Sequence, residues 1–94
     1  MHRIGYYHAT CEEVSRLLRQ EWERRKLTKY AVAQLSGVSQ AMLGYIEKGT
    51  RIPSLEVLLR IADGIGADLP ALIKKAQRNV EQLEGKSAKR KTAN

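Results

Sequence analysis

The chain has 94 residues, which is enough for one small domain, and we expect no separate ligand-sensing or catalytic domain. Its formal charge of +7 favours an acidic partner such as nucleic acid, although charge alone also fits non-specific binding. One cysteine excludes an intramolecular disulfide, and no signal peptide or long apolar run is present, so we expect a soluble cytoplasmic protein that does not enter membranes.

The first nine residues show no helical period, and we expect residues 1–9 to form a loosely packed extended arm. As alternatives, Tyr6 and Tyr7 lie across the domain, pair as an edge strand in a dimer, or reach DNA. A first helix is better marked, because Thr10 and Glu13 have the spacing of a capping box. The apolar spacing predicts that its buried stripe contains Val14, Leu17 or Leu18, and Trp22.

Residues 29–47 have the pattern of two short helices joined by a tight turn. Thr28 can cap the first of these helices and Ser39 the second, because each hydroxyl can accept an unpaired backbone N–H. Gly37 can take the positive φ that ends a helix, and Ala33 is small where the two helices must approach closely. The residues expected to face inward are Tyr30, Val32, Leu35, Val38, Leu43 and Ile46. Together these positions define a helix-turn-helix.

A fourth helix follows the motif, after a loop that runs from Gly49 to Pro53. Ser54 can cap this helix, and its sequence is apolar almost all round, as expected for a central helix. We expect Gly64 and Gly66 to stop it.

A fifth helix is predicted to begin at Asp68, whose carboxylate can cap it. Its apolar stripe should close the core from Leu69 to Ile73, whereas the later part has no obvious cover within the chain. The members of that later part, expected to form a homodimer interface, are Ala76, Val80 and Leu83. The alternative is a frayed, solvated helix end. Residues 85–94 are basic and polar and are expected to be disordered, where they either add salt-sensitive DNA affinity or only solubilise the chain.

The motif and the segment after it resemble the lambda-repressor-like helix-turn-helix family, also called the XRE or Cro/C1 type. The resemblance covers about residues 14–75. It is carried by Leu27-Thr28-Lys29, Ala33, Gly37-Val38-Ser39, Ile46-Glu47-Lys48-Gly49 and Pro53-Ser54. It implies an all-α, five-helix DNA-binding domain over residues 10–84, with the helix-turn-helix formed by helices 2 and 3 and with an extended fifth helix. The arm and the basic tail flank this domain.

Trp22 departs from the family, which commonly has an arginine here that pairs with the glutamate matching Glu47. With tryptophan in its place that ion pair cannot form. Glu47 is instead expected to pair with Arg25 or Lys26, or to cap backbone amides. The fold should survive, because a buried indole contributes more apolar area than an arginine stem.

A helix-turn-helix places its second helix in the major groove, where base edges present distinct hydrogen-bond patterns. Family members typically read bases from the positions that match Gln40, Ala41, Gly44 and Tyr45. Gln40 can bond adenine, Ala41 can contact a thymine methyl and Gly44 allows the helix to sit deep, while Tyr45 can bond a base edge or a phosphate. Two of the four have almost no side chain, so some specificity is expected from DNA shape.

Phosphate contacts are expected from polar residues grouped along one side of the motif, where the resemblance places backbone contacts. These residues are Lys29, Ser39, Lys48, Thr50 and Arg51. The plain alternative for each is a solvated surface residue, above all for Lys48.

The leading hypothesis is a DNA-binding transcriptional regulator, a homodimeric repressor that presents two helices about 34 Å apart to a palindromic operator. Antitoxins and restriction controllers use the same module, so a toxin or another regulator is an alternative protein partner. A second hypothesis is a coactivator-like interaction module that uses the fold to dock a protein.

An enzyme or metal protein is the third and weakest hypothesis. His2, His8 and Cys11 offer three metal-binding side chains without a fourth, and Cys11 fits the first turn of a helix better. No paired carboxylates, nucleophile constellation or phosphate-cradling glycine loop occurs in the sequence. We therefore expect no catalytic activity, no metal and no cofactor.

Overall fold

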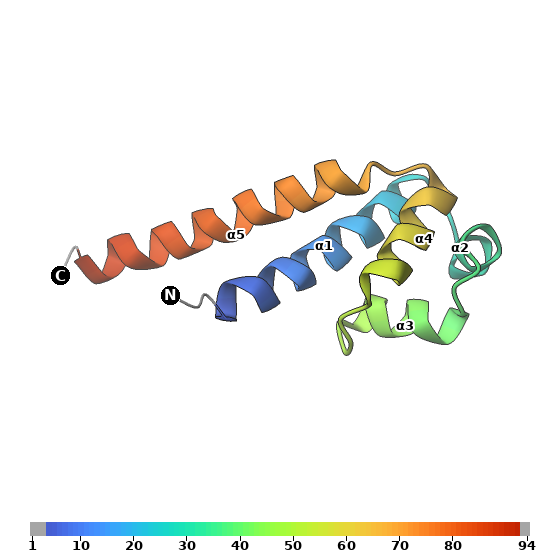
Figure 1. Cartoon of the computed structure of the whole chain (residues 1–94), viewed down its shortest axis with the longest axis horizontal. Helices are drawn as coiled ribbons and strands as arrows, with labels where there is room; N and C mark the ends of the chain where they lie inside the picture. Colours follow the sequence, from blue (N-terminus) through green and yellow to red (C-terminus); the bar gives the residue numbers. More distant parts are fainter. Residues whose placement is uncertain (1–3, 93–94) are drawn as a thin grey trace.

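The computed structural model describes the backbone of residues 4–92 and the side chains of residues 5–84. This part of the chain contains five α-helices and no strand (Figure 1). The helices are α1 (Ile4–Arg24), α2 (Lys29–Ser36), α3 (Gln40–Lys48), α4 (Leu55–Ile65) and α5 (Leu69–Thr92). The all-α, five-helix prediction is confirmed. In the described part of the chain, no helix combines the length and the apolar character needed to cross a membrane.

The predicted helix boundaries of the motif arise from local hydrogen bonds. Thr28, Ser39 and Ser54 each accept a backbone N–H from three residues further along, at 3.1, 3.1 and 3.2 Å. Asp68 caps α5 in the same way, because its carboxylate accepts the Ala71 N–H at 3.1 Å. The glycines with positive φ that end α2, α3 and α4 are Gly37, Gly49 and Gly66.

The core lies where the inner face of α1 meets the other four helices. Trp22 is 1% exposed and stands at its centre, together with Leu18, Val32, Leu43 and Ile61, all of which are fully buried. Both candidates for the middle position of the α1 stripe, Leu17 and Leu18, are buried. In the helix-turn-helix, the predicted inward positions are confirmed for Val32 of α2, for Val38 of the turn, and for Leu43 and Ile46 of α3.

Two residues of α2 that were predicted to face inward point outward, and α4, which was expected to be a central helix, also has an exposed apolar side. Tyr30 and Leu35 are 61% and 54% exposed, and Leu55 and Leu59 are 61% and 51% exposed. At Gly64, the backbones of α2 and α4 approach so closely that an added Cβ would lie 2.8 Å from the Leu35 carbonyl oxygen. Backbone atoms therefore make the contact between α2 and α4 at this point. Gly64 lies inside α4 and does not stop it, since Gly66 alone ends the helix.

α1 begins at Ile4, so residues 4–9 are helical and do not form an extended arm. Thr10 is interior to the helix, and its hydroxyl donates to the Tyr6 carbonyl at 2.6 Å, so the predicted capping box does not exist. Residues 1–3, the rest of the expected arm, lie outside the described residues.

The added turns of α1 pack along α5, and the two helices run side by side in Figure 1. Tyr6 is buried there, and its hydroxyl donates to the Glu81 carboxylate at 3.4 Å. Ala76 and Val80, at 0% and 6% exposure, are consequently covered by the chain itself, and the expectation that they form a dimer interface is wrong. Leu83 is 64% exposed.

The backbone of α5 continues as a helix to Thr92, where the composition had predicted disorder from residue 85 onward. Lysine, arginine and alanine are favourable helix residues, and an existing helix adds residues without a new nucleation step. Residues 93–94 lie outside the described residues.

Candidate nucleic-acid interface

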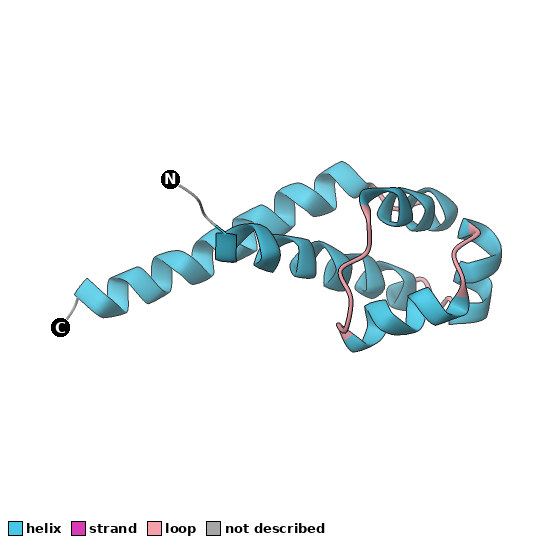
Figure 2. Ribbon diagram, turned by 60° about the horizontal axis from the view of Figure 1, so that its bottom comes forward, coloured by secondary structure: helices cyan, strands magenta, loops and turns pink. Residues whose placement is uncertain are grey.

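The four predicted base-reading residues share the outward side of α3, which lies at one edge of the molecule (Figure 2). Leu43 and Ile46 bury the opposite side of the helix and so fix its rotation. Gln40 is the first residue of α3 and is exposed, as is Ala41 one position later. Tyr45, one turn further on, is 36% exposed.

Gly44 occupies the middle of this outward side. A Cβ built on it would meet no described atom within 4 Å, so packing does not require glycine at this position. Glycine inside a helix costs about 1 kcal/mol relative to alanine. No contact within the described chain explains why glycine occupies this position despite the loss of stability.

Arg51 stacks on Tyr45. Its guanidinium carbon lies 4.4 Å from the centre of the Tyr45 ring, in cation–π geometry. The Thr50 N–H and hydroxyl both donate to the Tyr45 carbonyl, at 3.1 and 3.4 Å, which ties the loop back onto the last turn of α3. A predicted base reader and two predicted phosphate contacts thus form one connected unit.

Glu47 pairs with Lys29, at 3.2 Å between carboxylate and ammonium, and not with Arg25 or Lys26 as expected. Arg25 is held elsewhere, because it pairs with Glu21 one turn earlier and also donates to the Gly66 carbonyl at 3.2 Å. The first residue of α2 therefore faces the last turn of α3. Both side chains stay partly exposed, at 44% for Lys29 and 32% for Glu47.

Arg19 supplies a link between α1 and α3 that the sequence analysis did not identify. Its Nη1 donates to the Glu47 carbonyl at 3.1 Å, which places a cation at the negative end of α3. Its Nε is buried without a hydrogen-bond partner among the described residues. The place of Arg19 in the sequence was an available signal. Arg19 lies one turn before Trp22, and Trp22 occupies the position at which the family commonly has an arginine.

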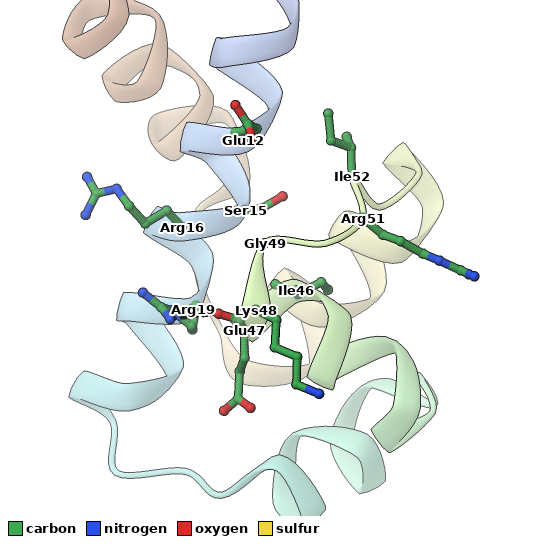
Figure 3. A pocket seen from close by; sticks show the side chains of 10 residues that line it. All are labelled: Glu12, Ser15, Arg16, Arg19, Ile46, Glu47, Lys48, Gly49, Arg51 and Ile52. Atoms are coloured by element: carbon green, nitrogen blue, oxygen red, sulfur yellow. Dashed lines mark hydrogen bonds between the residues drawn. The ribbon is translucent and has the colours of Figure 1, made fainter.

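A hollow of about 210 Å³ opens between α1, the end of α3 and the loop after it (Figure 3). Its lining mixes cations, carboxylates and apolar groups: Glu12, Ser15, Arg16, Arg19, Ile46, Glu47, Lys48, Gly49, Arg51 and Ile52. In Figure 3 the Arg16 and Arg51 side chains point away from each other on either side of it.

The suggested metal-binding residues do not meet in the described structure. His8 faces Glu12 at 3.6 Å, and Cys11 is an exposed residue within α1, not in its first turn. Within the described residues, no group of three histidine, cysteine or acidic side chains could hold a metal ion. His2 lies outside those residues.

The sequence model of the helix-turn-helix domain family matches residues 13–74, which is more than half of the chain. The matched range contains α2, α3 and α4 entirely and joins them to parts of α1 and α5. No curated protein and no solved structure matches the chain.

Proposed function

Because the chain belongs to the helix-turn-helix domain family, we propose that it is a sequence-specific transcriptional regulator of the lambda-repressor-like, or XRE, type. The outward side of α3 carries the proposal. Its four residues are small, polar or aromatic and uncharged, whereas Lys29, Lys48 and Arg51 flank them. A helix with such a surface fits the major groove, whose floor offers hydrogen-bonding edges and thymine methyls while phosphates line its rims.

In this proposal Gln40 makes the base contact that is most specific, a pair of hydrogen bonds to adenine. The N-terminal residues of a recognition helix lie nearest the base edges, and a glutamine amide can bond adenine N6 and N7 together. Ala41 contacts a thymine methyl, and Gly44 lets the helix backbone approach the groove floor. Tyr45 directs its hydroxyl to a base edge or a phosphate.

Arg51 is the strongest proposed phosphate contact, because its stacking on Tyr45 restricts the guanidinium before DNA arrives. Ser39 and Thr50 contribute neutral hydrogen bonds, and Lys48 adds an exposed charge at the same edge. Lys29 contributes less than a free lysine, since Glu47 partly neutralises it.

The proposed assembly is a homodimeric repressor, acting in the cytoplasm on a palindromic operator. One recognition helix reads too few base pairs to find a genomic site alone. Two copies related by a two-fold axis read two half-sites one helical turn apart, about 34 Å. The proposal includes neither catalysis nor a cofactor.

A protein-interaction module, including an antitoxin that binds a toxin, is the second candidate. The observation that favours it is the exposure of Leu35, Leu55 and Leu59, which leaves more apolar surface than the sequence predicted. In that case α3 would not read bases, and binding of a partner would survive changes to its outward side.

Selection of bound sequences from random duplex DNA tests the function directly. We expect the wild-type protein to enrich a palindrome, and a Gln40→Ala/Tyr45→Ala variant to lose the enrichment while keeping its fold. Gln77→Ala, an exposed amide on α5, is the matched control and should select the same palindrome. Weak, salt-sensitive binding without enrichment would contradict base reading and move the interaction module to first place.

A further inference from the structure

α4 carries an apolar face that the rest of the described chain does not cover. Leu55 and Leu59 lie one turn apart on it, and Ile52, 41% exposed, precedes them in the loop. The helix already buries its other side through Leu58, Ile61, Ala62 and Ile65. These three exposed side chains, the α4 face, are adjacent to the end of the helix-turn-helix.

We propose that the α4 face binds a second copy of this chain, with the two α4 helices crossing antiparallel about a two-fold axis. The inference rests on the proposed function, which needs two copies, and names the surface through which they meet. It replaces the α5 stripe, because Ala76 and Val80 are buried within the chain.

The charges beside the α4 face fit a second copy of the same face. Glu56 and Arg60 pair along the helix at 2.8 Å and are 73% and 53% exposed. When two such helices cross antiparallel near residues 57 and 58, Leu55 meets Leu59 of the other copy, and Glu56 lies opposite Arg60 of the other copy. An interface with two-fold symmetry must be self-complementary in this way, since both sides use the same residues.

The α4 face lies beside the helix-turn-helix, so pairing through it would hold two recognition helices at a set distance from each other. α4 packs on α2 through the backbone contact at Gly64, and a loop of six residues, 49–54, joins it to α3. Arg60 reaches the turn of the motif, where its Nη1 lies 3.6 Å from the point that a Cβ added to Gly37 would occupy. By contrast, Leu83 belongs to the C-terminal half of α5, and that half of the helix extends away from α2, α3 and α4 (Figure 1).

The size of the α4 face predicts a weak dimer. A standard stable interface buries about 800 Å² on each partner, far more than three partly exposed aliphatic side chains supply. We therefore expect mostly monomer in dilute solution and pairing when DNA brings two copies to adjacent half-sites, which multiplies their effective concentration.

Leu59→Glu tests the α4 face, and Leu83→Glu is the matched control that places the same charge on an exposed leucine of α5. Circular dichroism melting confirms that both variants fold. Sedimentation equilibrium at high concentration should show self-association that Leu59→Glu weakens at least tenfold and Leu83→Glu leaves unchanged. In DNA selection, Leu59→Glu should enrich single half-sites instead of a palindrome. Unchanged association and palindromes with Leu59→Glu, or their loss with Leu83→Glu, would overturn the inference.

A mixing experiment separates contacts between chains from the ion pair within α4. Glu56→Arg places two cations on α4, and Arg60→Glu places two anions there, so each variant should associate less than wild type. Mixing them should restore association at least to the wild-type level, because unlike faces then meet. The pair within the helix is broken in both variants and cannot cause this rescue. No gain on mixing would contradict the interface.

The two proposals fail in different ways. If wild-type protein enriches no DNA sequence, the DNA-reading function fails, while sedimentation and mixing still decide whether the α4 face pairs. If the palindrome is selected and depends on Gln40 but not on Leu59, the function stands and the α4 interface fails.

Discussion

Gly44 is the residue on the outward side of α3 for which packing supplies no explanation. We predict that Gly44→Ala stabilises the protein by about 1 kcal/mol, because alanine is the better helix residue and its methyl group meets open space. Urea unfolding measures this change. The same variant should bind the selected duplex at least tenfold more weakly, because the methyl group occupies space that DNA would fill. Higher stability with unchanged affinity would contradict a close approach of DNA at this position.

Glu47 restrains the charge of Lys29 beside the proposed phosphate track. We predict that Glu47→Gln strengthens non-specific DNA binding and steepens the slope of log affinity against log salt by up to about 0.9, the value for one added phosphate contact. Fluorescence anisotropy over a salt series measures both quantities.

Glu23→Gln is the control for Glu47, since it removes an exposed carboxylate elsewhere, on α1. It changes the net charge equally but should leave the slope closer to that of wild type. Equal slopes in the two variants would mean that Lys29 does not contact DNA, and that only the total charge of the protein matters.

At the scale of the elements, α2 and α4 meet without a side chain between them at Gly64. We predict that Gly64→Ala destabilises the fold by about 1–3 kcal/mol, because the added methyl would lie 2.8 Å from the Leu35 carbonyl oxygen and the helices must separate. Thermal and urea unfolding measure the loss. Gly44→Ala makes the same change inside a helix and should move stability in the opposite direction, so equal effects would contradict the close packing of α2 and α4.

α1 and α5 are joined by a hydrogen bond from the Asn79 amide to the Glu13 carboxylate, at 2.8 Å. The hydrogen bond from Arg16, with a smaller contribution from Asn79, holds the pKa of Glu13 below its ordinary value of 4.5, although partial burial opposes this shift. A carboxyl whose pKa is lower in the folded state stabilises the fold above its unfolded pKa. That stabilisation is lost as the pH falls through the folded value.

We therefore predict that stability falls as the pH drops below about 4.5, and that Glu13→Gln makes this fall shallower while lowering stability at neutral pH. Melting temperature measured at pH 3 to 7 checks both effects. Glu21, whose pKa is lowered by hydrogen bonds from Arg24 and Arg25, remains in the variant and retains part of the acid sensitivity. An unchanged profile in Glu13→Gln would contradict the assignment of acid sensitivity to this link.

In the whole molecule, the long pair of helices α1 and α5 has a different role from the three short helices. The pair extends the molecule to 51 Å, whereas α2, α3 and α4 gather at one end, where the proposed DNA-reading and pairing surfaces lie (Figure 1). Positive charge is also distributed unevenly along the chain. Four of the cations occur in the last nine residues, Lys86, Lys89, Arg90 and Lys91, so the remainder of the chain is only mildly basic.

The helix-turn-helix was predictable from the sequence, because each boundary signal acts within a few residues. Thr28 and Ser39 cap amides three positions away, Gly37 takes its positive φ in the turn, and Leu43 and Ile46 follow the period of one buried face. The sequence also placed the proposed DNA-reading residues together, since residues 40, 41, 44 and 45 share a face in any helix of that register.

The extent of the helices and the covering of their remaining faces depend on contacts between distant parts of the chain. The start of α1 depends on packing against α5, between residues as distant as Tyr6 and Glu81, and no local signal encodes it. That packing covers Val80, and close contact between the α2 and α4 backbones leaves Leu35 outside. The pairing of Glu47 with Lys29 likewise depends on how α2 meets α3. Local capping and periodicity specify a helix and its inward side, but burial of any other side requires a neighbour whose position only the assembled chain supplies.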